Sequence, residues 1–142
     1  FLGDSRIQTQ FPNGDGVNTD WTTTGTSHYT EVNETSHDGD STYVESGTVG
    51  DRDTYTFPNL GVTPATIFAV QVSGIVRKTN ANATSLKAVA VSNSTSGTSA
   101  TDTDVSTTYS KPLGAIFTKD PNTGSDWTVS GLDNAEFGVE VG

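Results

Sequence analysis

Apolar residues occur at every second position along most of the chain, and this two-residue period restricts the possible folds more than any other feature. Between Ala135 and Val141 every odd position is apolar, and every even position is Glu or Gly. Such alternation gives a β-strand one buried face and one solvated face. No segment carries an apolar stripe at the helical period of about 3.6 residues. The sequence therefore predicts an all-β fold with no substantial helix.

The same alternation marks further strands, which are separated by turns rich in Asn, Asp, Gly and Pro. The clearest predicted strands cover residues 53–57, 67–76, 85–92, 105–109, 113–117 and 135–141, and weaker candidates are Arg6 to Phe11, His28 to Val32 and Tyr43 to Val49. Predicted turns cover residues 12–16, 36–40, 80–82 and 120–124. The Ser/Thr-rich segment 92–104 is either a long loop or an exposed hairpin tip. About eight or nine short strands at this spacing predict an antiparallel, jelly-roll-like β-sandwich.

Length and composition indicate one folded domain. The chain has 142 residues, which is enough for one hydrophobic core but little for two. It contains no Cys, so neither a disulfide framework nor a thiolate metal site can form. We expect residues 1–12 to form an N-terminal strand or arm, and residues 13–142 to form a single β-sandwich domain.

The charge of the chain disfavours two classes of partner. Asp and Glu number 17 against 7 for Lys and Arg, which gives a formal net charge of -10. Such a surface repels the phosphates of nucleic acids and of anionic lipids. No apolar run approaches the roughly 18–20 residues that span a bilayer. We therefore expect no nucleic-acid partner and no membrane partner.

The N-terminal triplet Gly3-Asp4-Ser5 resembles the nucleophile block of the SGNH esterases and lipases. In that family the serine follows a buried parallel strand, and its histidine base lies near the C-terminus. Only two residues precede Gly3 here, and the only histidines are His28 and His37, in the first third of the chain. A serine hydroxyl without a base is a weak nucleophile at neutral pH. We predict that Ser5 begins a strand and that the chain has no catalytic residue.

Two acidic segments invite comparison with metal sites. Residues 13–20 alternate oxygen ligands as a calcium loop does, but the sixth and twelfth positions counted from Asn13 are Asn18 and Thr24 instead of Gly and Glu. The segment His37-Asp38-Gly39-Asp40 could also hold a divalent ion. Turn chemistry explains both segments, so we predict no metal site and no cofactor.

Four aromatic residues are candidates for stacking on a sugar ring, namely Trp21, Tyr29, Tyr43 and Trp127. Both tryptophans lie in polar, Thr/Ser-rich surroundings. An alternative interpretation places each tryptophan at one end of the sandwich, with its apolar rings buried and its indole N–H bonded nearby. We favour this second interpretation and keep sugar stacking as the alternative.

Several blocks together resemble a group of structural proteins in the virions of tailed bacteriophages and prophages. These blocks are residues 1–7, 38–44, 53–57, Trp127 and 134–139, and they span nearly the whole chain. The resemblance implies a particle component: a capsid decoration (cement) protein, a head fibre or a tail-associated protein. It also implies the major capsid protein or other virion proteins as partners, a location on the outside of an extracellular particle, and a homotrimer.

These considerations lead to two hypotheses for function. The first is a non-enzymatic decoration protein on the outside of the capsid, and the second is a carbohydrate- or receptor-binding module of a head or tail fibre. For the first, the candidate assembly arm consists of Arg6, Ile7, Gln8, Thr9, Gln10 and Phe11. This arm could add a strand to a neighbour's sheet edge, or it could pair within its own subunit.

Overall fold

Antiparallel strands make up most of the computed structural model, which describes residues 5–80, 85–99, 103–109 and 112–142. The main sheet has the spatial order β1 (Gly14–Thr19), β4 (Arg52–Thr56), β10 (Glu136–Val141), β6 (Ser85–Ser92) and β7 (Thr95–Thr98), and β8 (Thr103–Asp104) also pairs with β6. Two smaller ladders join β5 (Val70–Ile75) to β9 (Pro112–Phe117) and β2 (Thr22–Thr23) to β3 (Val44–Glu45). The described helices are η1 (Tyr29–Glu31) and α1 (Val129–Asp133). The predicted all-β antiparallel fold is confirmed.

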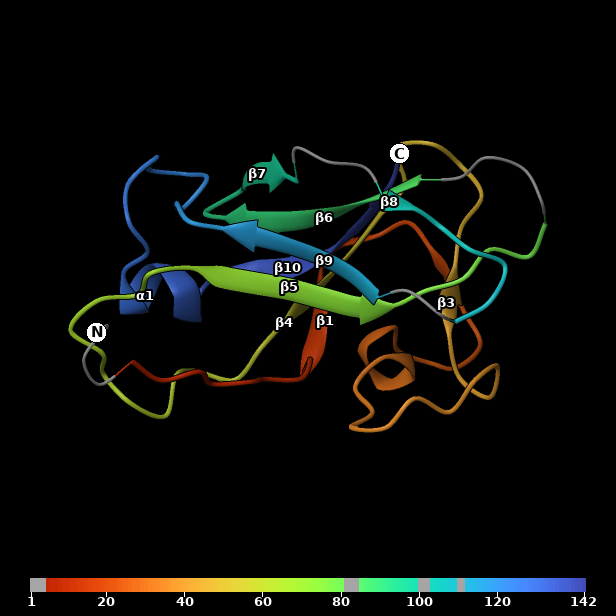
Figure 1. Ribbon diagram of the computed structural model, residues 1–142, viewed down its shortest axis with the longest axis horizontal. Helices are drawn as coiled ribbons and strands as arrows, with labels where there is room; N and C mark the ends of the chain where they lie inside the picture. The colour runs from red at the N-terminus through yellow and green to blue at the C-terminus, as the bar shows by residue number, and fades with distance from the viewer. Residues whose placement is uncertain (1–4, 81–84, 100–102, 110–111) are drawn as a thin grey trace.

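The β5–β9 ladder forms a second layer over one face of the main sheet (Figure 1). Two apolar clusters fill the space between the layers. One cluster is built on Leu86, Ala88, Val105 and Val141, and the other on Ala90, Trp127, Ala135 and Phe137. Val72 of β5 and Phe117 of β9 pack against both clusters. The structure is therefore sandwich-like, and the jelly-roll arrangement of its strands stays a prediction.

The two-residue period explains why β10 lies at the centre of the main sheet. Phe137, Val139 and Val141 point into the core, while Glu136 and Glu140 lie on the opposite face. Between them, Gly138 pairs with Thr54 of β4, and a Cβ at this position would clash with the backbone oxygen of Asp53. Gly is required here because the strand backbones approach closely.

The strand β1 forms where the sequence predicts a turn at residues 12–16. It pairs with β4 alone, at the edge of the main sheet, with a bulge between Asp15 and Thr19. Its side chains are alternately half-buried and exposed. An edge strand of this kind needs few apolar residues, because one side of its backbone faces no partner strand.

The segment 92–104, predicted as a loop or a hairpin tip, contains a hairpin. Strands β6 and β7 are joined by Asn93 and Ser94, which have φ angles of 45° and 66°. Two consecutive residues with positive φ are typical of a type I′ turn, which matches the twist of paired strands. Residues 100–102 of this segment lie outside the described part.

Several predicted strands do not form. Arg6 to Phe11 are irregular, and His28 to Val32 contain the short helix η1. Only Val44 and Glu45 are extended within the segment Tyr43 to Val49, and residues 105–109 contain no strand. The alternating residues of these segments do not form a continuous apolar face, so burial does not stabilise them in a sheet. Ser5 therefore does not begin a strand, and Gly3 and Asp4 lie outside the described residues.

Candidate functional site

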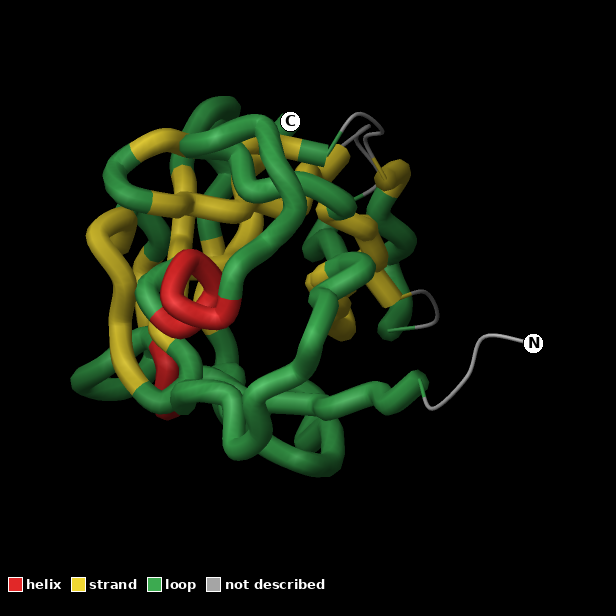
Figure 2. The backbone as a smooth tube through the Cα atoms, turned by 90° about the vertical axis from the view of Figure 1, so that its left-hand side faces the viewer, coloured by secondary structure: helices red, strands yellow, loops and turns green. Residues whose placement is uncertain are grey.

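A groove of about 1110 Å³ separates the arm (Arg6–Phe11) from strand β5. Its walls comprise Ser5 to Gln10, the segment from Val62 to Ser73, and the core residues Phe57, Leu60, Leu132 and Phe137, with Ile116 from β9. Figures 1 and 2 show the arm below the two layers, running from the start of β1 toward the side on which β5 and β9 lie. The groove therefore lies where the second layer of the sandwich stops.

The arm is attached to the domain near its C-terminal end. The backbone N–H of Asn13 donates to the oxygen of Thr56, and the Gln10 side chain donates to the oxygens of Pro58 and Asn59 at 2.7 and 3.2 Å. Among the described residues, no hydrogen bond involves Ile7, Gln8, Thr9 or Phe11. Ile7 is 98% exposed. Four residues of the arm, Ile7, Gln8, Thr9 and Phe11, thus carry backbone groups that the described part of the subunit does not pair.

The second layer is a ladder of two strands, and within the described residues neither β5 nor β9 is hydrogen-bonded to another strand, although β9 lies close to β6. One face of this ladder packs on the core. The other face, called here the outer face, includes Gln71, Ser73, Ile75, Gly114 and Ile116, as the register requires. Ile75 and Ile116 are 54% and 66% exposed. The layer therefore presents both open backbone edges and exposed apolar side chains.

Charge is distributed very unevenly over the fold. Residues 13–53 contain nine of the 17 acidic residues, whereas residues 54–101 contain none. Of the 23 residues that line the groove, Arg6 is the single charged residue. The outer face carries no charge either. Counting acidic residues segment by segment would have revealed this in the sequence, but net charge alone hides it.

A buried carboxylate network lies on the acidic side of the molecule. The Asp53 side chain is fully buried, and both of its oxygens lie 2.9–3.0 Å from Nδ1 of His28, which donates to them. The hydroxyl of Tyr55 donates to Oδ2 of Asp53 at 2.8 Å. Burial raises the pKa of Asp53, and the hydrogen bonds from His28 and Tyr55 partly offset this effect. Burial, together with the adjacent Asp53, also raises the pKa of Tyr55.

An Asp–His pair of this kind can orient an imidazole, as in hydrolytic triads. Ser5, however, lines the groove beside the arm, and neither His28 nor His37 belongs to the walls of that groove. The Asp53 carboxylate accepts from both of its neighbours, and every buried side-chain polar atom in the described part of the chain has a hydrogen-bond partner. The arrangement supports a structural link that holds η1 against the main sheet.

The structure assigns other partners to both segments compared with metal sites. Asp15 and Asp20 accept backbone hydrogen bonds from Tyr29 and Arg52, because residues 14–19 form a strand rather than a loop. Over the ranges that the structure describes, no group of three or more His, Asp or Glu side chains is placed to hold a metal ion.

In the second segment, Asp40 accepts from Arg77 Nε at 2.9 Å and from the hydroxyl of Tyr109 at 2.7 Å, and the Arg77 guanidinium lies over the ring of Tyr109. These two hydrogen bonds hold the pKa of Asp40 below its usual value. The ring of His37 contacts the edge of Tyr109. Arg77 thus already supplies the positive charge that a bound cation would bring.

The four aromatic candidates for sugar stacking lie in different environments. Trp127 is 4% exposed, its indole N–H donates to the oxygen of Phe117 at 3.0 Å, and it packs on Phe137. Trp21 packs against the other core cluster and donates to the oxygen of Asp51 at 3.2 Å. Tyr29 belongs to η1, and Tyr43 immediately precedes β3; both are half-buried. The structure therefore separates the two tryptophans, which pack in different core clusters.

Within the described residues, the structure contains no helix that combines the length and apolar character needed to cross a bilayer. Comparison of the chain with protein-family models, with curated proteins and with solved structures finds no match in any of the three.

Proposed function

We propose that this chain is a non-enzymatic structural component of a tailed-bacteriophage virion, and specifically a capsid decoration (cement) protein on the outside of the shell. The resemblance of the blocks at residues 1–7, 38–44, 53–57 and 134–139 points to a virion. The structural observation that carries the proposal is the uncharged outer face of the β5–β9 layer, with Ile75 and Ile116 exposed on it.

An uncharged apolar face is unusual on a chain with a net charge of -10. The two exposed isoleucines lie toward opposite ends of this face, with the uncharged pair Ser73 and Gly114 between them. On the outer face Ile116 pairs in register with Gln71, so its apolar side chain shares one surface with an uncharged neighbour. This surface suits contact with a coat protein, since docking there removes no ionised carboxylate from water.

A decoration protein can also bind a shell through many copies of one weak contact. A shell offers the same site many times, and linked copies gain avidity without any new contact. Elsewhere the acidic surface keeps particles apart through like-charge repulsion. The proposal includes a homotrimer and a jelly-roll-like sandwich whose short second sheet is extended by strands of a partner.

The test compares two double variants in binding to shells that lack this chain. Ile75→Asp with Ile116→Asp places two carboxylates on the outer face, and we expect at least about a ten-fold loss of affinity, since each buried unpaired charge costs more than 1.4 kcal/mol. The control is Val17→Asp with Val49→Asp, whose side chains are 74% and 75% exposed outside this face. It should bind like the original chain.

Localisation provides an independent measurement. Gold-labelled antibodies against the purified chain should decorate the capsids of intact particles, in many copies per shell. Purified particles that contain none of the chain would refute the proposal, and labelling confined to tail tips would favour a fibre component.

The alternative of a carbohydrate- or receptor-binding module has no specific structural observation in its favour. Trp127 is buried, and Trp21 is packed against the core. We expect titration with oligosaccharides to leave tryptophan fluorescence unchanged. A saturable shift that Tyr29→Ala or Tyr43→Ala abolishes would favour the alternative instead.

A further inference from the structure

We propose that the groove beside β5 receives the arm of a second copy of this chain, which adds to the open edge of β5 as a further strand. This inference rests on the proposed function and deepens it, because it names the partner that extends the second layer. It assigns the part of the outer face around Ile75 to the coat protein, and it assigns the groove, whose wall includes Gln71, Ser73 and Ile116, to contact between copies.

The first argument is complementarity of the backbones. Within the described residues β5 pairs with β9 alone, so one row of its N–H and C=O groups faces the groove without a partner strand. Ile7, Gln8, Thr9 and Phe11 of the arm have no hydrogen bond there either. Open strand edges readily pair with an added segment, which gains main-chain hydrogen bonds along its whole length.

The dimensions of the two segments match. The arm from Arg6 to Phe11 and the strand from Val70 to Ile75 each contain six residues. At about 3.3 Å per residue each is about 20 Å long when extended. The groove wall takes four consecutive residues from β5, Val70 to Ser73, but Ile116 alone from β9. The edge of β5 is therefore the acceptor.

The extent of the groove also fits a subunit interface. Besides Ser5 to Gln10, its walls comprise 17 of the 23 lining residues, which approaches the roughly 20–30 residues on each side of a standard protein interface. Ile7, Val62 and Phe68 in these walls are 98%, 51% and 74% exposed, so the subunit alone leaves large apolar side chains in water. Covering them requires a partner of the size of a strand and its flanking loops.

The distribution of charge favours a second copy of the chain as the occupant of the groove. Two copies, each with a net charge of -10, repel each other over most of their surfaces. The groove walls contain no carboxylate, and the arm carries only Arg6 as a charge. Here two copies meet without opposing like-charged acids. The arm also brings a positive charge toward a neighbour that is acidic elsewhere.

The geometry of the exchange favours a closed ring. The arm of one copy occupies the groove of the next, so donor and acceptor are different surfaces of the same chain. Such a head-to-tail contact closes into a ring when its rotation allows, and otherwise extends into a filament. A ring of three copies would agree with the proposed trimer.

Cross-linking tests the contact directly, because the chain contains no Cys of its own. One population carries Ile7→Cys, activated as a mixed disulfide, and a second carries Ser73→Cys. Attack by the second thiolate forms a disulfide between copies and releases the activating thiol. We expect a covalent product of twice the 14.8 kDa chain mass. Val49→Cys in place of Ser73→Cys is the control, since Val49 is 75% exposed but lies outside the groove. We expect at least about ten-fold less product with it, the ratio that 1.4 kcal/mol of preferential contact gives.

Sizing of the isolated protein in solution tests the same contact without Cys. The original chain should be oligomeric, and Ile7→Asp should raise its dissociation constant at least about ten-fold, which corresponds to 1.4 kcal/mol. Because Ile7 is 98% exposed, Ile7→Asp should not prevent the subunit from folding. Circular dichroism checks that the variant is folded. Val17→Asp, at 74% exposure outside the groove, should leave the assembly unchanged.

Three results would overturn the inference. The first is a monomer at all concentrations, and the second is equal cross-linking to Ser73→Cys and Val49→Cys. The third is a disulfide that forms within one chain carrying both Ile7→Cys and Ser73→Cys while the mixed populations remain unlinked, which would place the arm in its own subunit. None of these results involves a capsid. Because Ile116 lines the groove and Ile75 does not, Ile75→Asp alone judges binding to shells separately.

Discussion

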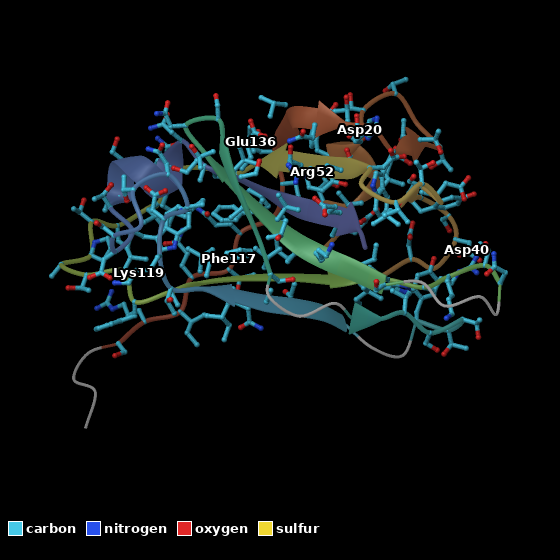
Figure 3. All side chains as sticks on the ribbon, turned by 90° about the horizontal axis from the view of Figure 1, so that it is seen from above. Asp20, Asp40, Arg52, Phe117, Lys119 and Glu136 are labelled. Carbon is cyan, nitrogen blue, oxygen red and sulfur yellow. The ribbon has the colours of Figure 1, made fainter. Side chains whose placement is uncertain are left out.

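The two outward faces of this sandwich-like fold differ in the kind of side chain that they expose to solvent. On the main sheet, away from β5 and β9, each carboxylate has named partners: Glu140 accepts from Arg52 at 2.5 Å and from Lys87 at 3.5 Å, and Glu136 accepts from Thr54 and from the backbone of Val17. Figure 3 shows Arg52 and Glu136 on this side. The outer face of β5–β9 instead carries Ile75 and Ile116 and no charge.

The comparison indicates which of the two faces makes its contacts within the subunit. The polar face has its hydrogen-bonding groups satisfied within the subunit, and β1 covers part of it through Val17 and Asn18. The β5–β9 layer leaves strand edges and apolar side chains without partners in the described structure. Substitutions should therefore affect the stability of the subunit on the first side and its associations on the second.

The largest expected contrast comes from truncating one apolar side chain in each layer. Phe137 is 6% exposed and packs on Trp127 and Phe57, so Phe137→Ala should lower the free energy of unfolding by about 3–5 kcal/mol. Ile116→Ala should change it by less than about 0.5 kcal/mol, since most of that side chain is already in water. Urea denaturation measures both, and comparable losses would contradict the contrast.

A second contrast uses glycines. A Cβ at Gly138 would collide with the backbone of Asp53, whereas one at Gly74 in β5 would meet nothing within 4 Å. We expect Gly138→Ala to lower the free energy of unfolding by about 3 kcal/mol through strain in the paired backbones. Gly74→Ala should be neutral or slightly stabilising. Thermal unfolding followed by circular dichroism would decide, and a tolerant Gly138→Ala would show that β4 and β10 can separate.

A smaller effect is expected at Asp53, the centre of the buried network. Asp53→Ala leaves His28 and Tyr55 without their acceptor, and we expect a loss of about 1–3 kcal/mol in the free energy of unfolding. Asp53→Asn keeps the shape and an acceptor, and should cost less.

The dependence on pH distinguishes the two protonation states. Burial raises the folded-state pKa of Asp53 above 3.8, so the folded chain holds a proton that the unfolded chain has already released. The free energy of unfolding should therefore decline as pH rises from about 3.8 through the raised pKa. Asp53→Asn should lack this decline. Parallel pH profiles for the two proteins would mean that the hydrogen bonds from His28 and Tyr55 outweigh burial.

The smallest expected effect is that of salt on association between copies. Salt screens the repulsion between acidic surfaces but does not weaken apolar contacts in the groove. Sedimentation should therefore show a dissociation constant that falls a few-fold between low and high salt. An association that salt weakens would mean that ion pairs, and not the uncharged groove, hold the copies together.

The sequence predicted the strands whose apolar alternation serves the core. The bounds of β6 are those expected, β9 and β10 differ by one residue at one end, and β4 is shifted by one residue at both ends. Strand β1 was missed because an edge strand of polar residues is specified by pairing with β4 and not by its own pattern. Arg6 to Phe11 was wrong as a strand within the subunit, since these residues belong to no ladder of the described fold.

Of the two parts of the candidate site, the sequence indicated only the arm segment. The arm was identified by its polar alternation, but its acceptor was not, because β5 and β9 are far apart in the chain and their pairing leaves no local signal. The favoured interpretation of Trp127 as a buried side chain with a bonded indole N–H is confirmed, whereas its neighbours in space, Phe137 and Phe117, could not be predicted from its polar neighbours in sequence.

The position of β10 has a consequence for biosynthesis. Its two neighbours, β4 and β6, are made earlier, yet neither pairs with the other. During translation β4 and β6 therefore each keep one unpaired edge until Glu136 to Val141 leaves the ribosome and inserts between them. Such late closure through contacts distant in sequence slows folding and exposes the nascent polypeptide to aggregation. We expect chaperones to hold this protein until β10 has been synthesised.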